Sequence, residues 1–130
     1  MKKIVWIIIL AVFTITFSIL EQVAINTILT KVEKETYEIQ QIIKENQELL
    51  SSTYLKEKVN KLIDYWTDKE NLLSYLVNHE NTEEIGVNLD QIKSYQKNNK
   101  LEEFEEGLSL IIYYCKSYRQ ILMISMQNIL

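Results

Sequence analysis

The sequence predicts an all-α protein, in which an N-terminal transmembrane helix continues into a small antiparallel bundle of three to four helices. Three observations lead to this fold class. The run from Ile4 to Leu20 carries no charge, apolar residues recur at helical spacing through the rest of the chain, and the 130 residues include two glycines and no proline. Because tight turns between strands depend largely on glycine and proline, β-hairpins have almost no signal here.

The first predicted element is a membrane anchor at residues 1–24. Its uncharged run spans about 25 Å as a helix, slightly short of the roughly 30 Å hydrocarbon core, and the residues that follow can supply the difference. Lys2 and Lys3 precede the run, and Trp6 suits a membrane interface. A cleaved signal peptide shares these features, but no small-residue cleavage site follows. We therefore expect an uncleaved signal-anchor that contacts membrane lipid through residues 4–24.

The charges that flank the anchor predict its orientation. Lys2 and Lys3 lie at one end, whereas Glu21 comes first at the other end and the next lysine is Lys31. By the positive-inside rule, the N-terminus is cytoplasmic and the helical domain is extracytoplasmic. The 13 lysines against one arginine, with 19 isoleucines and two alanines, are typical of an AT-rich bacterial genome. We expect a single-pass protein of a bacterial cell membrane.

The chain beyond the anchor is acidic. All 18 acidic residues and 12 of the 14 basic residues follow Leu20, which gives this part a net charge of about -6. Nucleic acid is excluded as a partner, because phosphate binding requires clustered lysine and arginine. Cys115 is the only cysteine, so an intramolecular disulfide is excluded. We expect a small buried side chain there rather than a reactive thiol.

Residues 25–50 are predicted to form an amphipathic juxtamembrane helix that continues the anchor without a break. The seam positions alternate steps of four and three residues, as in a coiled coil, and two of them are polar. The seam could face a second copy of the chain, giving a homo-oligomer, or the later helices. We favour the later helices because two polar positions weaken a dimer. The seam comprises Ile25, Leu29, Val32, Thr36, Ile39, Ile43, Asn46 and Leu50.

Residues 51–130 are predicted to form the helical bundle domain. Ser51-Ser52-Thr53 suits a chain reversal and the N-cap of a second helix. Asn81 and Glu84 have the spacing of a capping box for a third helix, which Asn98-Asn99-Lys100 closes. The predicted apolar faces are Leu55, Val59, Leu62, Trp66, Leu73, Leu76 and Val77, with Ile63 and Leu72 beside them; Ile85, Leu89, Ile92 and Tyr95; and Leu101, Phe104, Leu108, Ile111, Ile112, Cys115, Tyr118 and Leu122.

The fourth predicted helix has two special features. Gly107 costs about 1 kcal/mol of helix propensity relative to alanine, which indicates close approach of a neighbouring backbone. Residues 121–130 are mostly apolar but too few to span a membrane. We expect this tail to fold back over the core. The alternative is a partner-binding tail with anchoring residues Ile124, Met126, Ile129 and Leu130.

The sequence contains no constellation for catalysis, and we expect neither enzymatic activity nor a cofactor. His79 is the only histidine. Together with Glu80 and Glu83 it could ligate a metal if the segment is helical, since residues 79 and 83 are one turn apart. A histidine in a polar turn often has such neighbours by chance, so we expect no metal site. Two glycines cannot build a glycine-rich phosphate loop.

These observations favour a non-enzymatic accessory or scaffolding subunit that contacts another membrane or envelope protein. The alternative is an extracytoplasmic sensor that takes a small ligand between its helices, where several tyrosines could line a cleft.

Four features follow one another along the chain, and their order supports a resemblance to a known family. A basic start and a single membrane segment precede a tryptophan helix from Trp66 to Asn78-His79-Glu80. Ile85, Leu89 and Lys93-Ser94-Tyr95 follow, and the order closes with Met126-Gln127-Asn128-Ile129-Leu130. In this plan the chain resembles the DUF4363 type of small bacterial proteins of unknown function. Ser117-Tyr118-Arg119 stands where that family has a histidine-isoleucine-proline turn. The resemblance implies a membrane-anchored helical domain and brings no activity with it.

Overall fold

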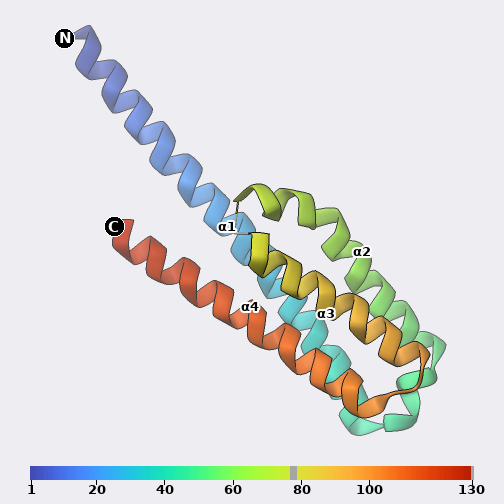
Figure 1. The fold of residues 1–130 in the computed structure, drawn as a ribbon. Helices are drawn as coiled ribbons and strands as arrows, with labels where there is room; N and C mark the ends of the chain where they lie inside the picture. Colours follow the sequence, from blue (N-terminus) through green and yellow to red (C-terminus); the bar gives the residue numbers. More distant parts are fainter. Residues whose placement is uncertain (77–78, 130) are drawn as a thin grey trace.

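The computed structural model describes the backbone of residues 1–76 and 79–129 and the side chains of residues 1–74, 82–124 and 127–128. These residues are helical apart from short connections, and no strand occurs among them. The elements in order are α1 (Lys2–Glu45), the 3₁₀ helix η1 (Gln47–Ser51), α2 (Thr53–Leu76), α3 (His79–Lys97) and α4 (Leu101–Ile129) (Figure 1). The prediction of an all-α protein is confirmed.

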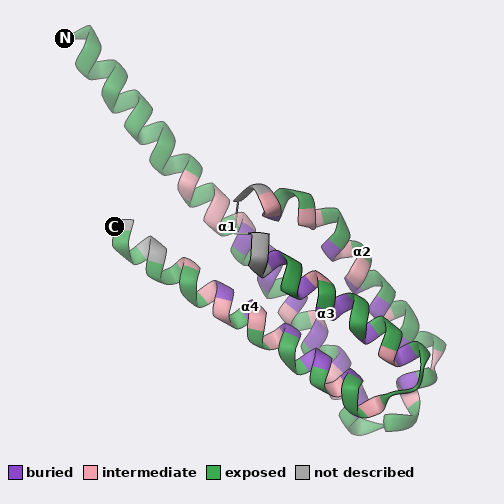
Figure 2. Cartoon of the chain, in the orientation of Figure 1, coloured by how far each residue is buried: buried purple, intermediate pink, exposed green. Residues whose placement is uncertain are grey.

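Helix α1 is continuous but has two parts with different surroundings. The part from Lys2 to Leu20 is exposed along almost its whole length. Within the described residues, α1 is the one helix long and apolar enough to cross a membrane. From Ile25 onward one side of the same helix is buried against the other helices (Figure 2). The predicted continuation of the apolar helix into an amphipathic one, without a break, is confirmed.

The predicted seam of α1 is buried at every position except Asn46. Thr36, a polar member, is buried, and its hydroxyl donates to the Val32 carbonyl at 2.7 Å. Asn46 instead has an extended backbone, and its Oδ1 accepts the Glu48 N–H at 3.1 Å. This side-chain bond competes with the helix. The helix predicted to reach Leu50 therefore ends at Glu45.

The core combines side chains from all four α-helices and η1. Helix α1 contacts both α2 and α4, and α3 contacts both α2 and α4. Trp66 and Phe104 are the largest fully buried side chains. Gln96 is also buried, and its Nε2 donates to the Leu50 carbonyl at 3.0 Å, which connects α3 to η1. Leu72, predicted to lie beside the apolar face of α2, is instead 46% exposed.

The predicted helix ends are correct in two places and wrong in one. Ser52 caps α2, with its Oγ accepting the Leu55 N–H at 3.2 Å. Asn99 ends α3 in the left-handed region at φ 56°, and the Lys100 N–H reaches back to the Tyr95 carbonyl at 2.9 Å. This is the Schellman arrangement. The capping box at Asn81 is wrong, because α3 already begins at His79.

Helix α4 differs from the prediction at Gly107 and at its end. The close neighbour of Gly107 is not a backbone but the side chain of Ile92 on α3. The predicted tail does not fold back, because α4 continues to Ile129. No proline or glycine interrupts this segment, so nothing in its local chemistry ends the helix.

Candidate functional site

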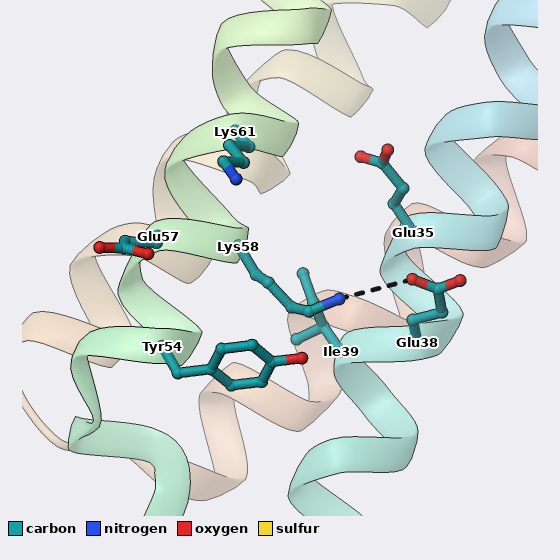
Figure 3. A pocket seen from close by; sticks show the side chains of 7 residues that line it. All are labelled: Glu35, Glu38, Ile39, Tyr54, Glu57, Lys58 and Lys61. Atoms are coloured by element: carbon teal, nitrogen blue, oxygen red, sulfur yellow. Dashed lines mark ion pairs between the residues drawn. The ribbon is translucent and has the colours of Figure 1, made fainter.

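A polar hollow of about 180 Å³ lies between α1 and α2 (Figure 3). The buried residues of both helices determine which side chains face it. On α1, Glu35 and Glu38 flank the buried Ile39; on α2, the polar residues alternate with the buried Leu55 and Val59. The lining consists of Glu35, Glu38, Ile39, Tyr54, Glu57, Lys58 and Lys61.

Lys58 crosses this hollow from α2 to α1. Its Nζ lies 3.6 Å from Oε2 of Glu38 and 5.5 Å from the centre of the Tyr54 ring. Both partners of the ion pair remain partly exposed, with side-chain accessibilities of 30% for Lys58 and 48% for Glu38. An exposed pair of this kind contributes about 0–1 kcal/mol to stability. Its charges can therefore exchange partners at little cost.

A second hollow of about 490 Å³ continues the first along α1 toward the N-terminus. The two share Glu35 and Glu38, and the added residues are Asn26, Thr27, Thr30, Lys31 and Lys34. We call the two hollows together the α1–α2 groove. Its first residue, Asn26, follows the end of the uncharged run at Leu20 by about 9 Å of helix.

Tyr65 of α2 lies beside this groove. The Nζ of Lys31 is 4.3 Å from the centre of its ring, which is a cation–π distance. Burial raises the pKa of the Tyr65 phenol, and the negative charges of Glu35 and Asp68 raise it further. The phenol therefore stays neutral and can donate a hydrogen bond at neutral pH.

The groove lining consists of carboxylates, ammonium groups, hydroxyls and one amide, with a single aliphatic side chain, Ile39, in its wall. Such groups can form ion pairs and hydrogen bonds with a polar ligand or surface that carries both signs of charge. The lining includes no histidine or cysteine, so it offers no imidazole base and no thiolate.

The three residues considered as metal ligands, where the sequence predicts no metal site, are described by the structure only in part. His79 and Glu80 are the first residues of α3, and their side chains lie outside the described residues. Glu83 is exposed. Among the side chains that the structure describes, no three of histidine, cysteine, aspartate and glutamate form a group that could hold a metal ion.

The residues proposed for the membrane and for a partner lie at the same end of the molecule. Lys2, Lys3 and Trp6 occupy the exposed start of α1. Ile124 of α4 is 59% exposed, whereas the side chains of Met126, Ile129 and Leu130 are outside the described residues. The ends of α1 and α4 both extend past α2 and α3 in the same direction (Figure 1).

A separate hollow of about 210 Å³ lies between α2 and α3, next to Trp66. Trp66 is 2% exposed, and its Nε1 has no hydrogen-bond partner among the described residues. Glu70, Glu83 and Asp90 line the same hollow. Gly86 leaves the space open, because a Cβ there would lie 3.2 Å from Nε1 of Trp66.

The sequence interpretation missed the groove residues. Glu35, Glu38 and Lys58 occur in charged runs that are typical of a solvated helix face. Their juxtaposition depends on the packing of α1 against α2, which the spacing within one helix does not reveal. The exposed side chains next to the seam were the available signal, since they must face whichever helix packs on that seam.

The chain matches no protein-family model, no curated protein and no solved structure. The resemblance to the DUF4363 type therefore remains a prediction.

Proposed function

We propose that the protein is a single-pass membrane protein whose extracytoplasmic helical domain acts without catalysis, as an accessory or scaffolding subunit for another membrane or envelope protein. The observation that carries this proposal is the position of the α1–α2 groove on the anchor helix itself. The groove begins at Asn26, about 9 Å beyond the uncharged run. A protein that fills it must therefore lie at the membrane surface.

The arrangement of the helices supports the proposal. We infer that they form an antiparallel bundle. Gln40 forms a hydrogen bond with Ser109, and Glu33 forms an ion pair with Arg119. Residue numbers therefore decrease along α1 in the direction in which they increase along α4. In such a bundle the anchor and the groove share one rigid helix. The depth of the anchor in the membrane then sets the distance of the groove from the membrane surface.

The orientation is also part of the proposal. Lys2 and Lys3 at the start of α1 favour a cytoplasmic N-terminus. A reporter that is active only outside the cytoplasm, fused after Leu130, should be active. Activity of a cytoplasm-specific reporter at the same position would contradict this orientation.

The partner contact can be tested by photo-crosslinking in native membranes. A photoreactive phenylalanine analogue replaces Tyr54, which lies in the groove and is 55% exposed, or Tyr113 of α4, which is 63% exposed and outside it. We expect stoichiometric capture of one protein from position 54 and not from position 113. Charge reversal by Lys58→Glu with Lys61→Glu should abolish the capture. Recovery of the protein alone from both positions would refute the proposal.

The alternative function, a sensor for a small ligand, is favoured by the hollow at Trp66. A ligand with a hydrogen-bond acceptor would satisfy the buried indole N–H, and a cationic group would face Glu70 and Asp90. Such a ligand would raise the melting temperature of the detergent-solubilised full-length protein by mass action. Gly86→Ala should remove that shift.

A further inference from the structure

The contacts between α1 and α4 fix their relative register. Nε2 of Gln40 donates to Oγ of Ser109 at 3.2 Å, and Arg119 forms an ion pair with Glu33 further along both helices. Ile129 follows Arg119 by about 15 Å of helix, and the same distance back from Glu33 reaches Val23. From the Gln40–Ser109 bond, Ile129 is about 30 Å further along α4, and the same distance back along α1 from Gln40 reaches Leu20. The end of α4 therefore lies level with the end of the uncharged run of α1.

The end of α4 has the composition of a segment at a membrane surface. No charged residue occurs from position 120 to 129. Ile121, Met123 and Ile124 are 54%, 62% and 59% exposed, so the domain itself does not cover them. Figure 2 shows this part of α4 projecting beyond the buried core of the domain.

The residues immediately before this segment also suit an interface. Lys116 and Arg119 are the last basic residues of the chain, and their stems can lie along apolar surface while their charged groups remain in water. The order from the domain toward the end of α4 is thus basic and then uncharged.

We propose that the end of α4, from Ile121 to Ile129, lies beside the α1 anchor in the lipid–water interface on the extracytoplasmic side of the membrane. Lipid covers the exposed side chains of Ile121, Met123 and Ile124. The segment is too short to span the bilayer, and its level is set by α1. The bilayer therefore holds the domain at two places. This inference rests on the proposed membrane anchoring of α1.

The test uses the full-length protein in vesicles of phosphatidylethanolamine with a minor fraction of phosphatidylglycerol. In a Cys115→Ala background, a polarity-sensitive fluorophore is attached to a single introduced cysteine, at Ile124→Cys, at Leu110→Cys or at Val12→Cys. Leu110 is the matched control, because it is exposed on the same helix about 21 Å from Ile124. Val12 reports on the anchor. Helix content by circular dichroism verifies that each variant is folded.

Two sets of vesicles then carry a quencher, one with a nitroxide on the acyl chain near the headgroup and one with a nitroxide near the end of the acyl chain. We expect loss of fluorescence at position 124 with the first quencher and at position 12 with the second, and none at position 110 with either. Quenching at position 12 without quenching at position 124 would overturn the proposal while leaving the anchor intact, and would assign the α4 end to water or to a protein. No quenching at either position would overturn the anchoring itself, and the proposed function with it.

Discussion

Gly107 of α4 lies so close to Ile92 of α3 that a Cβ at position 107 would be 2.6 Å from Cγ2 of Ile92. Both residues are fully buried, and Cγ2 belongs to the branch point of a β-branched side chain, whose rotamer is restricted. The two helices therefore cannot accept a methyl group here without moving apart.

We predict that Gly107→Ala destabilises the protein, although alanine is the better helix former. Overpacking costs about 1–3 kcal/mol, against about 1 kcal/mol gained in propensity, so the free energy of unfolding should fall by up to about 2 kcal/mol. In an Ile92→Ala background, which lacks Cγ2, the same change should be neutral or stabilising. Ile92→Val retains Cγ2 and should give no such rescue. Urea unfolding of the six combinations in detergent measures the coupling.

Gln96→Ala should lower the free energy of unfolding by about 1–3 kcal/mol, because the buried carbonyl of Leu50 loses its donor. The matched control is Gln91→Ala, an exposed glutamine on the same helix, which should stay within about 0.5 kcal/mol of the parent. Equal melting temperatures for the two variants would show that the bond from Gln96 contributes no net stability.

Substitutions of Asn99 test the left-handed backbone conformation in the turn between α3 and α4. Since φ is 56° there, Asn99→Gly removes the steric cost of a side chain and should be neutral or stabilising. Asn99→Val should destabilise by about 1–2 kcal/mol, since a β-branched residue is strained in this region. Thermal unfolding monitored by circular dichroism gives the melting temperatures, which should be highest with glycine at position 99 or equal to those with asparagine, and lowest with valine. A valine variant as stable as the parent would contradict the turn geometry.

The burial of the Cys115 thiol leads us to predict that the stability of the protein depends on pH in the alkaline range. Burial raises the pKa of its thiol from 9.0 to about 12, the charge of Glu33 acts in the same direction, and Arg119 partly opposes them. The unfolded chain therefore loses this proton at a lower pH than the folded chain, and the contribution to stability is lost as the pH rises from 9 toward 12. Below pH 9 the contribution is complete.

Comparison of the parent with Cys115→Ala isolates this effect from the titration of lysines and tyrosines. The stability of the parent should fall more steeply above pH 9 than that of the variant. In addition, the folded parent should react with a thiol reagent far more slowly than the urea-unfolded chain, because the thiolate is the reactive form. Equal labelling rates in the two states would contradict the burial of Cys115.

The helical elements were predictable where one periodicity dominates. The seam from Ile25 to Ile43 and most of the predicted faces of α3 and α4 are buried, since an apolar stripe must face a partner wherever that partner is. The exceptions on these two faces are half-buried: Tyr95, Leu101, Ile112 and Leu122. The same pattern failed at Asn46, where a side chain bonds the backbone of Glu48 and ends the helix. Spacing could not reveal this competition.

The candidate groove was less predictable. Lys58 and Glu38 lie on different helices and are brought together only by the packing of Ile39 against α2. Gly107 gave a correct signal of close approach, but the neighbour, a side-chain methyl group, depends on the register between α3 and α4. Periodicity reports which side of a helix is buried. It does not report what lies opposite.

The contact between α1 and α4 joins the first helix of the chain to the last. Ile25 and Leu29 line one small hollow together with Tyr118, so the side of the α1 seam that faces α4 stays uncovered during synthesis until nearly the whole polypeptide has emerged. Closing such a long loop delays these contacts relative to the local ones between α2 and α3. The domain must therefore complete its fold after translation, and until then the exposed seam is a surface that a chaperone can recognise.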